Sequence, residues 1–138
     1  VKLMESGSGS ISTTHAASAQ QTIRKLITCA MEAGPQISQE LAATKLADTV
    51  DLVVQLACDV VPGTGGSTGR KLRYVEEILQ ITSGERPRGY AANVVFRRVP
   101  GECAVASTRP DELMEVLEAN GFDLSGFERE MAHNGGLA

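Results

Sequence analysis

The sequence predicts a mixed α/β fold in which two amphipathic helices precede a set of antiparallel strands. Residues 18–31 carry apolar side chains at helical spacing, the pattern of a helix with one buried face. Residues 50–61 and 71–82 are rich in apolar residues and flank a glycine-rich loop, which is typical of a long hairpin. The chain is 42% hydrophobic but only 4% aromatic, so its core is expected to be aliphatic.

The first residues indicate a chain that enters from a preceding helix. Val1–Glu5 resembles the last turn of such a helix, and Ser6–Gly9 forms a flexible break. Ser10–His15 is short and β-prone, and an extended backbone would place Ile11, Thr13 and His15 on one face. Because the sequence opens at Val1 without an initiator methionine, we expect it to be a piece of a longer protein.

Two helices follow this segment. Ser18 and Gln21 have the spacing of a capping box, which predicts a helix start at Ser18. Gly34-Pro35 ends this helix, and Ser38 begins a second one that runs to about Asp48. The apolar stripe of the first helix is expected to be buried; it consists of Ile23, Leu26, Ile27, Ala30 and Met31.

The strands come next. Val50–Val61 predicts a mostly buried strand, Pro62–Gly69 a flexible hairpin tip, and Lys71–Thr82 the returning strand. A basic turn then leads to two shorter strands, at about Ala91–Val99 and Glu102–Ala106.

The last predicted element is a helix over Asp111–Asn120 with Thr108 as its cap. Its inner stripe is expected to be Leu113, Val116 and Leu117. Phe122, Leu124 and Phe127 are expected to fold back onto this helix, and residues 128–138 to form a frayed tail.

Composition excludes several classes of function. A formal net charge of −4 argues against nucleic-acid binding over the whole chain and against broad attachment to an acidic membrane. Three widely spaced cysteines suit a reducing compartment, and no metal site is expected from the Cys and His spacing. No apolar run reaches the ~20 residues of a membrane helix, and no signal peptide opens the sequence.

Three further features are interpreted as structural. The glycines of the 63–69 loop never stand five apart before a Lys-Ser/Thr pair, so no phosphate-binding loop is predicted there. Glu76 and Glu77 would point to opposite faces of a strand, which excludes a paired carboxylate site. Asp111 and Glu112 suit the first turn of a helix.

The stretch Gly7–Ala16 is a small-residue turn and a β-prone segment that place one imidazole just ahead of a capped helix. An imidazole there can donate to a phosphate oxygen or relay a proton, and the alternative is a structural or solvent-exposed histidine. The run Gly-Ser-Ile-Ser-Thr-Thr-His-Ala-Ala-Ser resembles the histidine box of the type II/type IV secretion and pilus ATPases. The similarity continues through Leu46–Leu56 and Arg73–Ile78. Ser107–Pro110 and Gly121–Leu124 resemble the ending of the tight-adherence (CpaF-like) branch.

The resemblance implies the C-terminal part of a RecA-like P-loop NTPase core with an antiparallel β-rich extension. It places His15 near the γ-phosphate of ATP, with Thr13 and Thr14 in supporting positions. The nucleotide-binding Walker A and Walker B residues would belong to earlier sequence. ATP and Mg²⁺ are therefore expected in the full-length protein, neither is expected to bind this chain tightly, and the chain alone is not expected to hydrolyse ATP.

The arginine clusters have two readings. One is that they lie on solvated turns and strand faces. The other is that they contact a neighbouring subunit or a membrane-embedded partner; the candidates are Arg70, Arg73, Arg86 and Arg88. The resembled motors form rings, commonly hexamers, and dock on inner-membrane secretion platform proteins. The resemblance thus implies a cytoplasmic protein peripherally associated with the inner membrane.

The predicted organisation has three parts. Residues 1–82 would form the C-terminal half of the ATPase core, 83–127 a small extension of strands and a helix, and 128–138 the tail. The expected function is to couple ATP hydrolysis to protein secretion or pilus assembly. Two alternatives stay open: a non-catalytic oligomerisation or docking module, and a conjugative DNA-transfer ATPase of the same superfamily.

Overall fold

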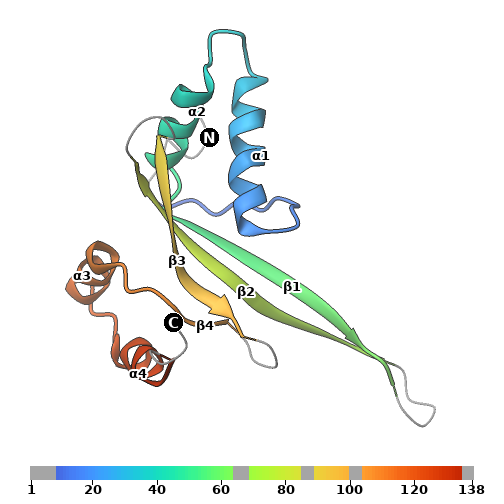
Figure 1. The fold of residues 1–138 in the computed structure, drawn as a ribbon, viewed down its shortest axis with the longest axis vertical. Coiled ribbons are helices and arrows are strands. Elements are labelled where there is room, and N and C mark those ends of the chain that lie inside the picture. Colours follow the sequence, from blue (N-terminus) through green and yellow to red (C-terminus); the bar gives the residue numbers. More distant parts are fainter. Residues whose placement is uncertain (1–8, 64–68, 85–88, 100–103, 135–138) are drawn as a thin grey trace. The chain divides into compact units, whose positions relative to one another are not determined.

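A computed structural model describes residues 9–63, 69–84, 89–99 and 104–134. Within these residues four helices accompany a four-stranded antiparallel sheet of order β1-β2-β3-β4, so that β1 and β4 form its edges (Figure 1). The mixed α/β class predicted from the sequence is thereby confirmed. The elements are α1 (Ala19–Met31), α2 (Gln39–Ala47), β1 (Leu52–Val61), β2 (Arg70–Ser83), β3 (Tyr90–Arg98), β4 (Ala104–Ala106), α3 (Asp111–Ala119) and α4 (Ser125–Asn134).

The helix starts follow from capping. Ser18 has an extended backbone and its Oγ accepts a hydrogen bond from the Gln21 amide at 3.2 Å. Ser38 does the same for the Leu41 amide, also at 3.2 Å. Both predicted N-caps are therefore confirmed, and each satisfies a backbone donor that the helix leaves unpaired.

Several predictions about individual elements are wrong. Ser10–His15 is not a strand, because no described strand pairs with it. Most of β1 is exposed, contrary to the expected buried strand. Thr108 does not cap α3, whose N-cap is Pro110 without a side-chain hydrogen bond. Residues 128–134, expected to lie in an irregular tail, belong to α4.

The chain divides into two compact units, each built from separate stretches of sequence. The first comprises residues up to Val53 together with Leu79–Asn93, and the second comprises Val54–Ile78 together with Val94 onward. The predicted helix at Val1–Glu5 and the break up to Ser8 lie outside the described residues, as do the centre of the predicted hairpin tip and Arg86 and Arg88.

The first unit has an aliphatic core, as the composition predicted. α1 packs against α2. Ile23, Leu46 and Leu79 are the largest fully buried side chains in the described part of the chain. Ile23 and Ile27 of the predicted α1 stripe are buried, but Met31 is exposed.

The second unit has its own apolar cluster. Val95, Met114 and Leu124 are its buried members, and the partly buried side chains around them are Ile78, Phe96, Leu117 and Phe127. The rings of Phe96 and Phe127 meet edge to face with centroids 5.4 Å apart, which fixes α4 beside β3. β3 pairs with β4 so that Phe96 faces Ala106.

In this second unit Met114 is the buried residue of α3, which the expected stripe did not include. Of that stripe, Leu117 packs against the cluster, whereas Val116 is exposed. Leu124 and Phe127 do pack into the cluster, as expected. Phe122 remains exposed, so this part of the prediction is wrong.

Candidate functional site

The histidine-containing segment is an exposed, irregular stretch that leads into α1. Gly9 has a φ of +79°, a left-handed conformation that favours glycine. The side chains of Thr13, Thr14 and His15 are all exposed. Three residues after His15, the Ser18 cap begins the helix and fixes the point at which the segment joins it.

One contact ties this segment to the helix that follows it. Nζ of Lys25 donates a hydrogen bond to the backbone carbonyl of His15 at 2.8 Å. The two residues are ten positions apart, so the Lys25 side chain links the second turn of α1 to the segment that precedes the helix. The contact also brings an ammonium group close to the backbone of the histidine.

The chemistry of this segment suits an anion. The imidazole, the two threonine hydroxyls and the Lys25 ammonium are all able to donate hydrogen bonds. Thr13, Thr14 and His15 are accessible to a ligand because they are exposed. A phosphate oxygen is an acceptor that such donors bind well.

The arginines proposed for subunit contact lie elsewhere. Arg70 and Arg73 are exposed on β2, in the second unit, whereas His15 belongs to the first. Arg86 and Arg88 are outside the described residues. Of the proposed contact arginines, the structure thus describes Arg70 and Arg73, and both belong to a different unit from His15.

A polar cluster on the hairpin escaped the sequence analysis. The hydroxyl of Tyr74 donates to Oδ2 of Asp59 at 3.0 Å, and Arg98 reaches the same oxygen at 3.4 Å. Arg98 also donates to the Tyr74 hydroxyl and stacks over the tyrosine ring, with 4.2 Å between the guanidinium carbon and the ring centroid. Partial desolvation and the bond to Asp59 raise the pKa of Tyr74.

This cluster joins β1, β2 and β3 through one residue of each. Its only signal in the sequence is Asp59, a single charge within an otherwise uncharged strand. Among the described residues, Nε of Arg98 is buried without a hydrogen-bond partner. Because Asp59, Tyr74 and Arg98 bind one another, we interpret the cluster as a structural contact that holds the three strands together.

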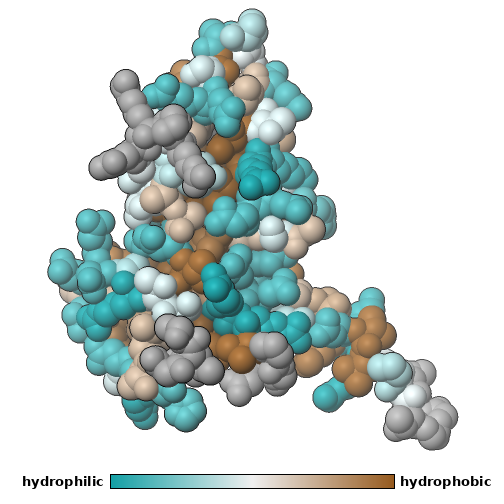
Figure 2. All heavy atoms as spheres, viewed as in Figure 1, coloured by the Kyte–Doolittle hydropathy of each residue, from teal (hydrophilic) through white to brown (hydrophobic). Residues whose placement is uncertain are grey.

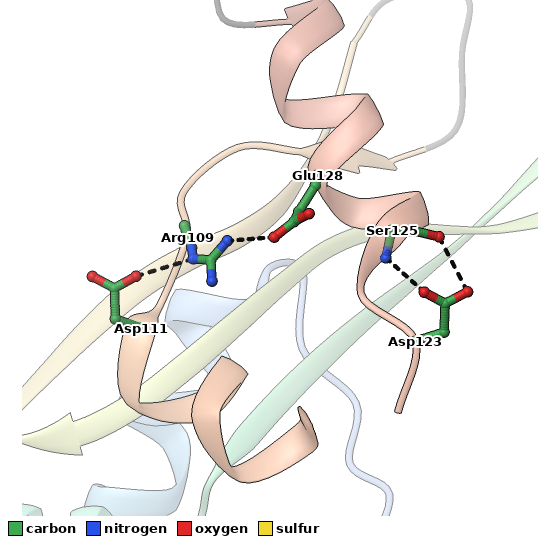
Figure 3. A network of polar contacts seen from close by, with 5 residues as sticks. All are labelled: Arg109, Asp111, Asp123, Ser125 and Glu128. Carbon is green, nitrogen blue, oxygen red and sulfur yellow. Dashed lines mark hydrogen bonds and ion pairs between the residues drawn. The ribbon is translucent and has the colours of Figure 1, made fainter. Parts of the chain in front are cut away.

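A second polar network fixes the two C-terminal helices (Figure 3). Arg109 donates to Asp111 at 3.1 Å and to Glu128 of α4 at 2.8 Å. The bond to Glu128 is the main reason that the pKa of Arg109 is raised. Asp123 accepts hydrogen bonds from the amide and hydroxyl of Ser125, at 2.9 and 3.1 Å, and these hold the pKa of Asp123 below its ordinary value.

The described residues contain no group of three or more His, Cys, Asp or Glu side chains that could hold a metal ion. None of the described helices combines the length and apolar character needed to cross a membrane. Comparison with known proteins gives no match for the chain among family models, curated proteins or solved structures.

Proposed function

We propose that this chain is part of a motor ATPase that couples ATP hydrolysis to protein secretion or pilus assembly. The observation that carries the proposal is the histidine segment: Thr13, Thr14 and His15 are exposed directly ahead of a capped helix. The ordered resemblance of the surrounding sequence to secretion ATPases supports the same function. His15 would sense the terminal phosphate, with Thr13 and Thr14 beside it.

The residues of this segment fit a contact with the terminal phosphate of ATP. The imidazole of His15 donates to a phosphate oxygen, and Lys25 holds the backbone of the histidine through its carbonyl. Bound ATP would supply the phosphoanhydride bond whose cleavage powers the motor. The residues that cradle the other phosphates and hold Mg²⁺ would come from another part of the protein, in a RecA-like core.

The proposal extends to the assembly. Each protein would join a homo-oligomeric ring, a hexamer in the resembled family, on the cytoplasmic side of inner-membrane platform proteins. Arg70 and Arg73 are exposed and so are accessible to a neighbouring subunit. Arginines that reach a neighbour's nucleotide are a common feature of ring ATPases.

The decisive experiment compares two histidine variants of the full-length protein. His15→Ala should lower ATP turnover by about tenfold or more, which corresponds to ~1.4 kcal/mol of transition-state stabilisation. His133→Ala, which removes the exposed histidine of α4, is the matched control and should retain full turnover. Thermal unfolding of both variants should match the parent, because both side chains are exposed.

Normal turnover in a folded His15→Ala variant would contradict the proposal. So would a parent protein that lacks a Gly-x-x-x-x-Gly-Lys-Thr loop ahead of this region. In either case a non-catalytic docking module becomes the better description. The exposed apolar side chains of β1 favour that second function, because solvent-facing apolar strands mark interaction surfaces.

A further inference from the structure

The outermost strand of the sheet presents an open edge. β1 stands at one end of the strand order, so among the described strands it pairs with β2 alone. One side of its backbone therefore has N–H and C=O groups that no described strand uses. Such an edge is a template for pairing with another extended segment.

One face of this edge strand is apolar and exposed. Val54, Leu56, Cys58 and Val60 alternate along β1 and therefore point to the same face. The exposed fractions of Val54, Leu56 and Val60 are 49%, 67% and 68%, and Cys58 is exposed as well. Figure 2 shows apolar surface on the β1–β2 hairpin, next to the grey residues of its tip.

The strand carries none of the usual protection against pairing. Exposed edges are commonly blocked by lysine, proline or a charge on the apolar face, and β1 has no lysine, arginine or proline. Its single charge, Asp59, alternates with the apolar residues and so lies on the other face. There its Oδ2 already binds Tyr74 and Arg98.

We propose that β1 pairs with β1 of a second copy of this chain, antiparallel and centred on Ala57. In this register Val54 lies opposite Val60 of the second copy, and Leu56 lies opposite Cys58. The four exposed side chains of each copy thus lie directly beside the same four of the other, on one face of the joined sheet. Cross-strand apolar pairs of this kind are the main stabilising unit of an antiparallel sheet.

The polar residues of β1 favour this register over its neighbours. With Ala57 at the centre, the carboxylate of Asp59 lies opposite the side-chain amide of Gln55, which is able to donate to it. Moving the centre to Leu56 places Asp59 opposite Val53, and moving it to Cys58 places Asp59 opposite Ala57. Neither alternative gives the carboxylate a polar neighbour on the second strand.

The proposed contact differs from the ring of the proposed function and does not depend on it. Two-fold pairing uses the same surface on both copies and occupies the β1 edge of each, so this contact adds no third copy and stops at a dimer. A ring requires two different surfaces on each subunit. The contact also lies within a single compact unit, since residues 54–60 all belong to the second one.

Sedimentation across a wide range of protein concentration tests the dimer. As its concentration rises, the unsubstituted 138-residue chain should shift from a mass of 14.6 kDa to twice that mass, with no larger species. Leu56→Lys should remain monomeric, because a charge then lies within the apolar pairs. Val116→Lys, at an exposed site on α3, is the matched control and should still form dimers.

Three sedimentation results would overturn the proposal. They are a monomer at the highest concentration that the protein reaches, a dimer that persists in Leu56→Lys, and growth beyond the dimer. Circular dichroism must show that both lysine variants fold. Because Leu56 and Val116 are both exposed, neither lysine is expected to unfold the chain.

Oxidative cross-linking tests the register in a chain where Cys29→Ser and Cys103→Ser leave Cys58 alone. Adding Leu56→Cys places thiols opposite Cys58 of the second copy, at a distance that a disulfide spans, and should trap a covalent dimer. Val54→Cys in the same background should cross-link far less, because Val60 lies opposite it. Equal cross-linking of the two variants, or ready cross-linking through Cys58 alone, would refute the Ala57 register.

Discussion

Lys25 of α1 binds the backbone of His15 through a hydrogen bond of 2.8 Å from Nζ to the carbonyl oxygen. The bond holds the segment that carries the candidate histidine against the helix that follows it. Since Thr13, Thr14 and His15 are all exposed, burial contributes little to the order of this segment. The Lys25 contact is therefore an important local restraint on the position of the imidazole.

The first prediction concerns this restraint. Lys25→Met should speed hydrogen exchange of the amides of residues 13–17 by about twofold to fivefold, the range expected for losing one exposed charged contact. Arg24→Met, at the neighbouring exposed position of α1, is the control and should leave these amides unchanged. Equal exchange in the two variants would show that Lys25 does not hold the segment in solution.

The second prediction concerns Gly89, which has a φ of +74°. A Cβ atom here would lie 3.1 Å from Oγ1 of Thr44 and 3.3 Å from Cβ of Ala43, so strain and crowding act together. Gly89→Ala should destabilise the protein by at least ~1 kcal/mol in denaturant titration. Gly126→Ala in α4, where nothing lies within 4 Å, should instead stabilise it by ~0.5–1 kcal/mol.

The regular elements of the fold were largely predictable because their signals are local. Ser18 and Ser38 accept hydrogen bonds from amides three residues ahead, and the sequence alone shows that spacing. The strands were found within one or two residues of their ends wherever the structure describes them. The same kind of local signal gave a wrong prediction at Thr108, which was expected to be the N-cap of α3. Pro110 occupies that position.

Burial was harder to predict than secondary structure. In α3 the apolar residues 113, 114, 116 and 117 cover a wide arc, so spacing does not decide which of them point inward. Met114 is buried and Leu117 packs beside it, whereas Val116 is exposed. In β1 an apolar strand predicted burial, yet the strand lies at the sheet edge and its even-numbered face is exposed. Both outcomes depend on partners that are distant in the sequence.

The candidate site was predictable only in part. The sequence motif singled out His15, but the contact from Lys25 depends on the irregular backbone path of residues 10–17 ahead of the helix. The cluster of Asp59, Tyr74 and Arg98 depends on pairing between three strands, so no spacing in the sequence indicates it.

The third prediction compares two leucines of α2. Leu46 is 1% exposed and Leu41 is 43% exposed. Leu46→Ala should lower the free energy of unfolding by ~2–5 kcal/mol, because it leaves a cavity in the core of the first unit. Leu41→Ala should cost well under half as much. Similar losses at the two positions in chemical denaturation would show that the α2 face is not buried as described.

The last prediction concerns Asp123 and acid stability. Hydrogen bonds from the amide and hydroxyl of Ser125 lower the pKa of this carboxyl below its ordinary value of 3.8. A carboxyl with a lowered folded-state pKa stabilises the protein fully above its unfolded-state value. That contribution is lost as the pH falls toward and through the folded-state pKa. The effect should therefore vanish progressively below about pH 4.

Two variants separate the charge of Asp123 from its capping role. Asp123→Asn keeps an oxygen that can accept from the Ser125 amide, so it should remove only the pH-dependent part. Asp123→Ala should remove both parts and be less stable than Asp123→Asn at every pH. Urea titrations of the three proteins between neutral pH and about pH 3 measure these differences. If the gap between the parent and Asp123→Asn stays constant over this range, the carboxylate of Asp123 does not contribute to acid stability through its bonds with Ser125.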